Sequence, residues 1–193
     1  MNWKYIMIII PVPILLLICG CTLNGYQKIT LTKQDVTFSF EYPITYQQQE
    51  ESDGSIAYTF SVVFLRPDGD TIKLDYSNIN TAFSIHIFDQ TEKFPNATSY
   101  LDARLSDYSD ALDYQLFERS RILLSGVEGE FASYKMRTGL SGEYLDPKTS
   151  YFREVYLDYK GKEWVIDISC YQEMIEQVKE EFDHIIQTFK FLD

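Results

Sequence analysis

His86, His184 and Cys170 are the side chains of this 193-residue chain that best suit acid–base or nucleophilic chemistry. Neither histidine has a nucleophile beside it in the sequence. The chain also lacks a nucleophile elbow, a glycine-rich phosphate loop and a pair of histidines at metal-ligand spacing. Cys170 stands where a strand passes into a helix, which suits a reactive thiol, but a lone cysteine is more often a small buried hydrophobe. We therefore predict no catalytic residue and no bound cofactor or metal.

Two groups of acidic residues have a functional and a structural interpretation. Asp68 and Asp70 flank a glycine as in part of a calcium loop, but the other oxygen ligands and the closing glutamate are missing. Pro-Asp-Gly is strong turn chemistry, so a hairpin turn explains this pair better. The second group lies in or beside a predicted helix and could bind a divalent cation, but we expect it to be the solvated face of that helix: Asp102, Asp107, Asp110 and Asp113.

The overall charge restricts the kinds of partner. The chain carries 29 acidic and 17 basic residues, a formal net charge of −12 at pH 7. Such a surface repels nucleic acid and anionic lipid headgroups. We expect no nucleic-acid partner. The acidity could also serve a cation or a basic partner, but ordinary solubility explains it first.

The N-terminal segment has the parts of an export signal in the right order. Lys4 gives a positive start, residues 6–18 are apolar, and Gly20 is a small residue directly before Cys21. A spanning helix needs about 20 apolar residues. This run is shorter and contains two prolines, which favours a cleaved signal peptide. An uncleaved membrane anchor is the alternative.

The sequence Ile18-Cys19-Gly20-Cys21 resembles the lipobox of bacterial and archaeal lipoprotein precursors. The resemblance implies that the Cys21 thiol receives a diacylglyceryl group and that the chain is cut between Gly20 and Cys21. Residues 1–20 would then be a signal peptide, residues 21–26 a short tether and residues 27–193 one domain. The protein would be lipid-anchored at the extracytoplasmic face of a cell membrane or outer membrane. Cys170 would be the single free thiol, and no internal disulfide could form.

Strand signals dominate the rest of the chain. Residues 37–42 alternate apolar and polar side chains, and residues 29–32 before them are β-prone, which predicts an opening hairpin. Further strands are expected at residues 55–65, 71–76, 82–88, 115–124, 130–137, 151–159 and 163–170. Short turn sequences join several of them in pairs. This pattern predicts an antiparallel sheet.

Two amphipathic helices are expected to cover that sheet. The first begins near Asn96, after Pro95, with an apolar stripe of Leu101, Leu105, Tyr108 and Leu112. The second runs through residue 186, with Ser169 and Gln172 at capping-box spacing, and residues 187–191 close as a short edge strand. Strands with helices in the middle and at the end predict the α+β class.

Three segments together resemble the PsbP-like fold: residues 38–43, the hairpin 151–170 around Lys160-Gly161-Lys162, and the last helix running into residues 188–191. The resemblance covers residues 27–193 and implies an α/β/α sandwich with an antiparallel sheet of about seven strands. The family is best known for extrinsic photosystem subunits that help retain ions and assemble a membrane complex. None of its metal-binding or partner-binding motifs falls on particular residues here.

Two classes of function remain. The first, which we favour, is a membrane-tethered binding or accessory protein of an envelope complex. The second is an envelope hydrolase or ion-binding enzyme whose site is assembled from scattered residues. A deep pocket with polar side chains around His86 would favour the enzyme, and a shallow apolar patch rimmed by charge would favour docking.

Overall fold

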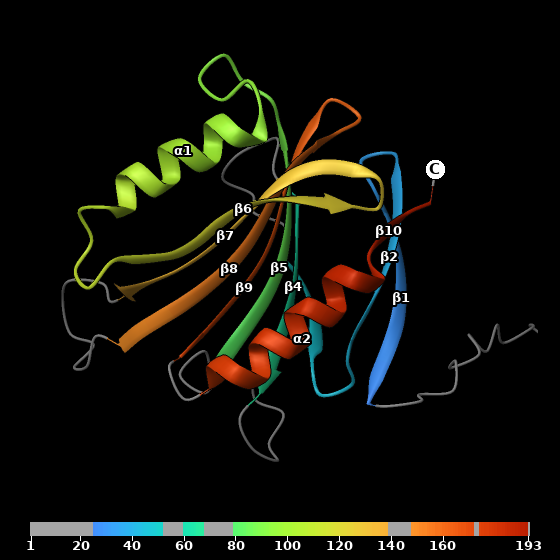
Figure 1. Cartoon of the computed structure of the whole chain (residues 1–193). Coiled ribbons are helices and arrows are strands. Elements are labelled where there is room, and N and C mark those ends of the chain that lie inside the picture. The colour runs from blue at the N-terminus through green and yellow to red at the C-terminus, as the bar shows by residue number, and fades with distance from the viewer. Residues whose placement is uncertain (1–24, 52–59, 68–78, 139–147, 172–173, 193) are drawn as a thin grey trace, which may run out of the picture.

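The computed structural model describes residues 25–51, 60–67, 79–138, 148–171 and 174–192. Within these ranges, two antiparallel sheets and two helices confirm the α+β class (Figure 1). In chain order the elements are β1 (Tyr26–Lys33), β2 (Val36–Pro43), β3 (Gln47–Glu51), β4 (Phe60–Pro67), β5 (Ile79–Asp89), α1 (Ala97–Tyr108), β6 (Gln115–Leu124), β7 (Val127–Thr138), β8 (Lys148–Tyr159), β9 (Lys162–Tyr171), α2 (Ile175–Thr188) and β10 (Lys190–Phe191).

The larger sheet has seven strands in the order β3-β4-β5-β9-β8-β7-β6, which matches the predicted size. Each neighbouring pair is antiparallel. The predicted hairpins account for β6–β7 and β8–β9, while the β5–β9 pairing joins distant parts of the chain. Strand β3 was not predicted, because its sequence Gln-Gln-Gln-Glu-Glu lacks the apolar alternation of a half-buried strand.

A smaller sheet in the order β1-β2-β10 was also not predicted as a separate unit. The opening hairpin forms as expected: Lys33 pairs with Val36 across a two-residue turn, where Gln34 and Asp35 have φ of 48° and 63°. Positive φ at both central residues is the backbone of the turn that suits tightly paired strands. Strand β10 then pairs with β2 from the far end of the chain.

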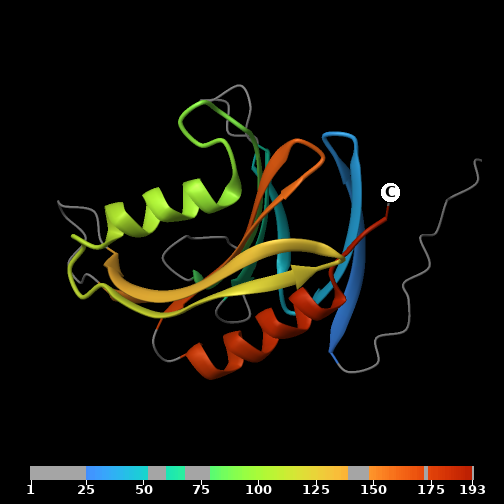
Figure 2. The same ribbon diagram turned by 45° about the horizontal axis from the view of Figure 1, so that its top comes forward.

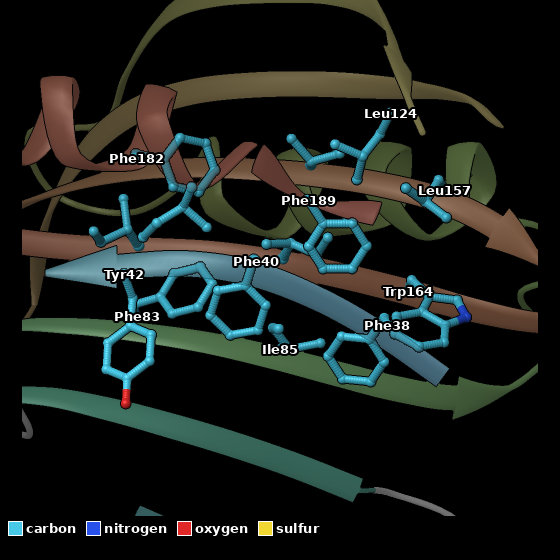
Figure 3. Close-up of a cluster of buried hydrophobic side chains, with 14 of the residues drawn as sticks. Phe38, Phe40, Tyr42, Phe83, Ile85, Leu124, Leu157, Trp164, Phe182 and Phe189 are labelled. Carbon is cyan, nitrogen blue, oxygen red and sulfur yellow. The ribbon is translucent and has the colours of Figure 1, made fainter. Parts of the chain in front are cut away.

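The main core lies between the larger sheet, the smaller sheet and α2 (Figure 3). Phe38 and Phe40 of β2 stack on Phe189, with ring centroids 5.6 and 6.0 Å apart. Trp164 of β9 meets the edge of Phe38 at 5.2 Å, and Phe182 of α2 is 1% exposed. Because strand side chains alternate between faces, this core takes every second residue of β5, β8 and β9.

Helix α1 packs on the opposite face of the larger sheet, as Figure 2 shows. Its Leu101 and Leu105 are buried against Tyr134 and Tyr156 of β7 and β8. The predicted start is confirmed, since the Asn96 side chain accepts a hydrogen bond from the Ser99 backbone N–H at 2.8 Å. The predicted α/β/α layering is thus observed.

The other helix boundaries differ from the prediction. Helix α1 ends at Tyr108, so Leu112 lies beyond it and is 70% exposed instead of buried. Ser169 lies within β9, where it cannot cap α2. The helix starts after Met174 without a side-chain cap, because the strand extends to Tyr171. Neither helix in the described part of the chain is long and apolar enough to cross a bilayer.

Candidate functional site

The clearest surface depression on the α2 face runs between α2 and strands β6 to β9, and we call it the α2–β6 groove. It consists of two adjoining hollows of about 410 and 220 Å³ that share Glu118 and Arg153. Apolar side chains from four strands and the helix line it together with several charged groups. The principal apolar members are Phe117, Tyr151, Ile168, Ile175, Val178, Phe131 and Ile186.

Phe117 reaches the groove because the ladder between β6 and β7 is irregular at that point. The register shifts between Leu116 and Glu118, which leaves Phe117 without a partner residue on β7. A bulge of this kind redirects a side chain. The Phe117 ring, in a residue 49% exposed, stacks on Tyr151 at 6.0 Å with 4° between the planes. Two aromatic faces are therefore presented together at one end of the groove.

Arg153 of β8 separates the two hollows. Its Nη2 donates to Asp183 of α2 at 2.6 Å, and its guanidinium lies over the rings of Phe131 and Phe182 at 5.0 and 5.6 Å. The ion pair and the two ring contacts hold this side chain across the gap between sheet and helix. The groove thus combines apolar and charged side chains, and the fixed Arg153 guanidinium lies between its two hollows.

A third hollow, of about 570 Å³, lies on the other face of the same sheet edge, and we call it the α1-side hollow. Its walls come from Thr98 of α1 and from the β6–β7 hairpin: Arg121, Ile122, Leu123, Glu128, Gly129 and Glu130. Arg119 stands beside it, bonded to Asp102 at 2.7 Å and to Glu130 at 2.7 Å. Depressions therefore occur on both faces of β6.

A buried ionic cluster beneath α1 was missed in the sequence. Glu154 of β8 is fully buried and accepts hydrogen bonds from Arg104 at 3.0 Å, Tyr134 at 2.9 Å and Tyr156 at 2.6 Å. Burial raises the pKa of Glu154, and the Arg104 charge opposes that rise. Burial foremost, and then Glu154, raise the pKa of both tyrosines, which keeps them as donors. The only sequence signal was a glutamate on the same strand face as Phe152 and Tyr156.

His86 lies on the same face of the sheet as this cluster. Its Nε2 is 3.2 Å from an Asp167 carboxylate oxygen, and Asp167 lies opposite Glu154 in the ladder. Ser84, two residues before His86, also lies opposite Asp167 and is buried. His86 lines none of the three hollows. None of these three depressions is therefore the pocket around His86 that would favour an enzyme.

The other residues singled out in the sequence are dispersed. His184 of α2 is bonded to Glu41 at 3.0 Å and its ring stacks on Tyr26 at 3.8 Å. Cys170 is 4% exposed and forms part of the floor of the groove, as expected for a buried thiol.

The four aspartates of the first helix region do not form one site. Asp102 pairs with Arg119, and Asp113 pairs with Arg137 at 2.6 Å beyond the helix end. Asp107 and Asp110 are exposed. Among the described residues, no group of three or more histidine, cysteine or acidic side chains could hold a metal ion. Gly20, Cys21, Asp68 and Asp70 lie outside the described residues.

No family model matches the sequence, and no curated protein matches it. Solved structures with a similar fold include the PsbP-like protein CyanoP of Synechocystis sp. PCC 6803, with 18% identity and a TM-score of 0.55 over 90% of this chain and 96% of that one. The Ran-binding protein Mog1p of Saccharomyces cerevisiae has 10% identity and a TM-score of 0.55 over 89% and 97%. LpqN of Mycobacterium tuberculosis, described as involved in cell envelope biogenesis, has 12% identity and a TM-score of 0.52 over 88% and 93%.

These similarities define the fold of the chain, which is the PsbP-like fold predicted from the sequence. Identities of 10 to 18% establish no function, because one fold carries many unrelated activities.

Proposed function

We propose that this protein is a lipid-anchored accessory protein that binds a protein partner through the α2–β6 groove, at the extracytoplasmic face of a cell membrane or outer membrane. The observation that carries the proposal is the groove itself: aromatic and aliphatic side chains gathered in an open depression together with charged side chains. Protein interfaces likewise combine exposed aromatic and aliphatic side chains with charged and polar groups. An exposed phenylalanine stacked on a tyrosine is typical of a binding surface.

Two similar structures support a role in binding rather than catalysis. Mog1p is a Ran-binding protein, and LpqN is involved in cell envelope biogenesis. Both are consistent with a protein partner, and the second with the envelope location that the lipobox resemblance implies. The alternative of a hydrolase would require His86 and Asp167 to act on a substrate at a site separate from the three hollows.

Replacing Phe117 tests the docking surface. We expect Phe117→Ser to reduce the recovery of co-purifying envelope proteins from detergent-solubilised membranes at least tenfold, because aromatic anchors carry much of the binding free energy of an interface. Ile44→Ser is the matched control, since Ile44 is 52% exposed but lies outside the groove. Quantitative mass spectrometry of both preparations measures the loss. Equal recovery with the two variants would exclude the groove as the docking site.

Replacing Cys21 tests the anchor. Cys21→Ala removes the only thiol at the proposed lipidation site, so we expect an unprocessed precursor that carries no acyl chains. Two acyl chains give stable attachment, at about 0.8 kcal/mol for each buried methylene. Metabolic labelling with a fatty acid, together with the size of the chain on a gel, measures both steps. Labelling and cleavage that persist in the variant would rule out lipidation at Cys21.

A further inference from the structure

Strand β6 forms one edge of the seven-stranded sheet over ten residues, whereas the opposite edge, β3, has five. Most of its residues are exposed, including Leu116, Phe117 and Leu123. A long exposed edge offers a row of backbone donors and acceptors to another strand. Native proteins protect such an edge by shortening or covering it, or with charged side chains and bulges. β6 carries a bulge at Phe117 and charges on Glu118, Arg119 and Arg121, but it remains long and exposed and can accept an added strand.

The hairpin turn determines which backbone groups face outward. Ser125 and Gly126 form a two-residue turn with φ of 52° and 83°, closed by the pair Leu124 and Val127. Hydrogen-bonded and non-hydrogen-bonded pairs alternate along an antiparallel ladder. Counting back from the closing pair, Arg119, Arg121 and Leu123 direct their N–H and C=O groups away from β7. These groups can pair with an added strand.

The hollows on the two faces match the alternation of such a strand. On the α2 face, the smaller hollow of the groove is lined by Ser120, Arg121 and Ile122 of β6 together with Phe182 of α2. On the α1 face, the α1-side hollow is lined by Arg121, Ile122 and Leu123, so the two hollows adjoin along the edge of β6 at Arg121 and Ile122. Successive side chains of a strand point to opposite faces, so those of a strand beside β6 would lie alternately over the two hollows. Main-chain pairing then gives affinity, and the hollows give specificity.

The charges on β6 disfavour a second copy of this chain paired about the centre of the strand, at residues 119 to 121. A two-fold axis at Ser120 would place Arg119 opposite Arg121, and an axis at either arginine would place it opposite its own copy. Like charges directly opposite each other are destabilising. Arg119 is paired with Asp102 and Glu130, whereas Arg121, which lies opposite Glu130 in the β6–β7 ladder, is exposed and forms no ion pair with another described residue. An acidic side chain opposite Arg121 would complement it.

We propose that β6 binds an extended segment of a protein partner by strand addition, with an acidic side chain beside Arg121 on the α1 face and apolar side chains over the groove on the α2 face. This inference rests on the proposed function, since it specifies how the partner engages the groove.

The test uses the full-length chain in detergent micelles and a phage-displayed library of random twelve-residue peptides as the probe. Peptides are selected on the parent protein, and their affinities are then measured for the parent and for two variants. Arg121→Pro removes an outward N–H, whereas Arg121→Ala keeps it. We expect the selected peptides to alternate apolar and acidic residues. They should lose at least tenfold in affinity on Arg121→Pro and clearly less on Arg121→Ala. Hydrogen exchange should show new protection at the amides of Arg119, Arg121 and Leu123.

Thermal unfolding of Arg121→Pro within a few degrees of the parent shows that the sheet is intact. If Arg121→Pro unfolds at a clearly lower temperature than the parent, the comparison is made instead between Leu123→Pro and Leu123→Ala. Leu123 is 68% exposed, and its backbone N–H also faces outward. No enrichment of peptides, or peptides that bind without protecting the three amides, would overturn strand addition. If Phe117→Ser still abolishes recovery of envelope proteins in that case, the groove remains the docking site and only the strand mechanism fails.

Discussion

Arg104→Met should destabilise the domain by about 3–5 kcal/mol at pH 8, because it leaves the fully buried Glu154 carboxylate without its cation. The hydroxyls of Tyr134 and Tyr156 would remain as donors, but they carry no charge to balance it. Urea unfolding measures the loss. At pH 5 the loss should be smaller, because Glu154 can then take up a proton instead of remaining ionised in an apolar site.

Two further variants show whether the loss of stability comes from breaking the buried ion pair or would follow the loss of any arginine contact. Arg137→Met breaks an exposed pair with Asp113, whose side chains are 41% and 47% exposed, and should cost under about 1 kcal/mol. Adding Glu154→Gln to Arg104→Met should recover part of the stability, since the charge that needed a partner is gone. If Arg104→Met costs no more than Arg137→Met, the cluster beneath α1 does not stabilise the domain as an ion pair.

Glu163→Gln should change how stability depends on pH. Glu163 of β9 is 3% exposed, its Oε1 has no hydrogen-bond partner, and Asp158 lies opposite it on β8. Burial first, and then the Asp158 charge, raise the pKa of Glu163 to about 7. The folded protein therefore keeps a proton between pH 4.5 and 7 that the unfolded chain releases.

The sign follows from proton linkage. Below pH 4.5 both states hold the proton, and as the pH rises to 7 the parent loses stability, by about 2–3 kcal/mol for a pKa difference of this size. The glutamine variant cannot titrate, so its free energy of unfolding should fall less between pH 5 and 8. Glu128→Gln, at an exposed position on β7, is the control and should keep the parental slope. Identical slopes for the parent and Glu163→Gln would show that Glu163 ionises at an ordinary pH.

The hairpins and the first helix start were predictable from the sequence because their causes are local. Residues 37–42 alternate, the turn at Gln34 and Asp35 separates two β-prone runs, and Asn96 caps the residues that follow it. The boundary of α2 was not predictable in the same way. Ser169 and Gln172 have capping spacing, but pairing with β8 extends β9 to Tyr171. Tertiary pairing here overrides a local signal.

The candidate site depended on contacts between distant residues. The strand at residues 115–124 was predicted, but nothing local shows that Tyr151 stacks on Phe117 or that Arg153 reaches Asp183. The partners of Glu154 come from α1, β7 and β8, and only the folded sheet brings them together.

The sequence by itself determined the α+β class, the strand hairpins, the presence of two amphipathic helices and the acidic composition, because periodicity, turn chemistry and charge are properties of neighbouring residues. Only the tertiary structure decided that β10 joins β2, that Glu154 is buried as an ion pair, and that hollows lie on both faces of the edge strand β6. Each of these depends on which distant segments pack together, and that is set by the burial of apolar surface over the whole domain.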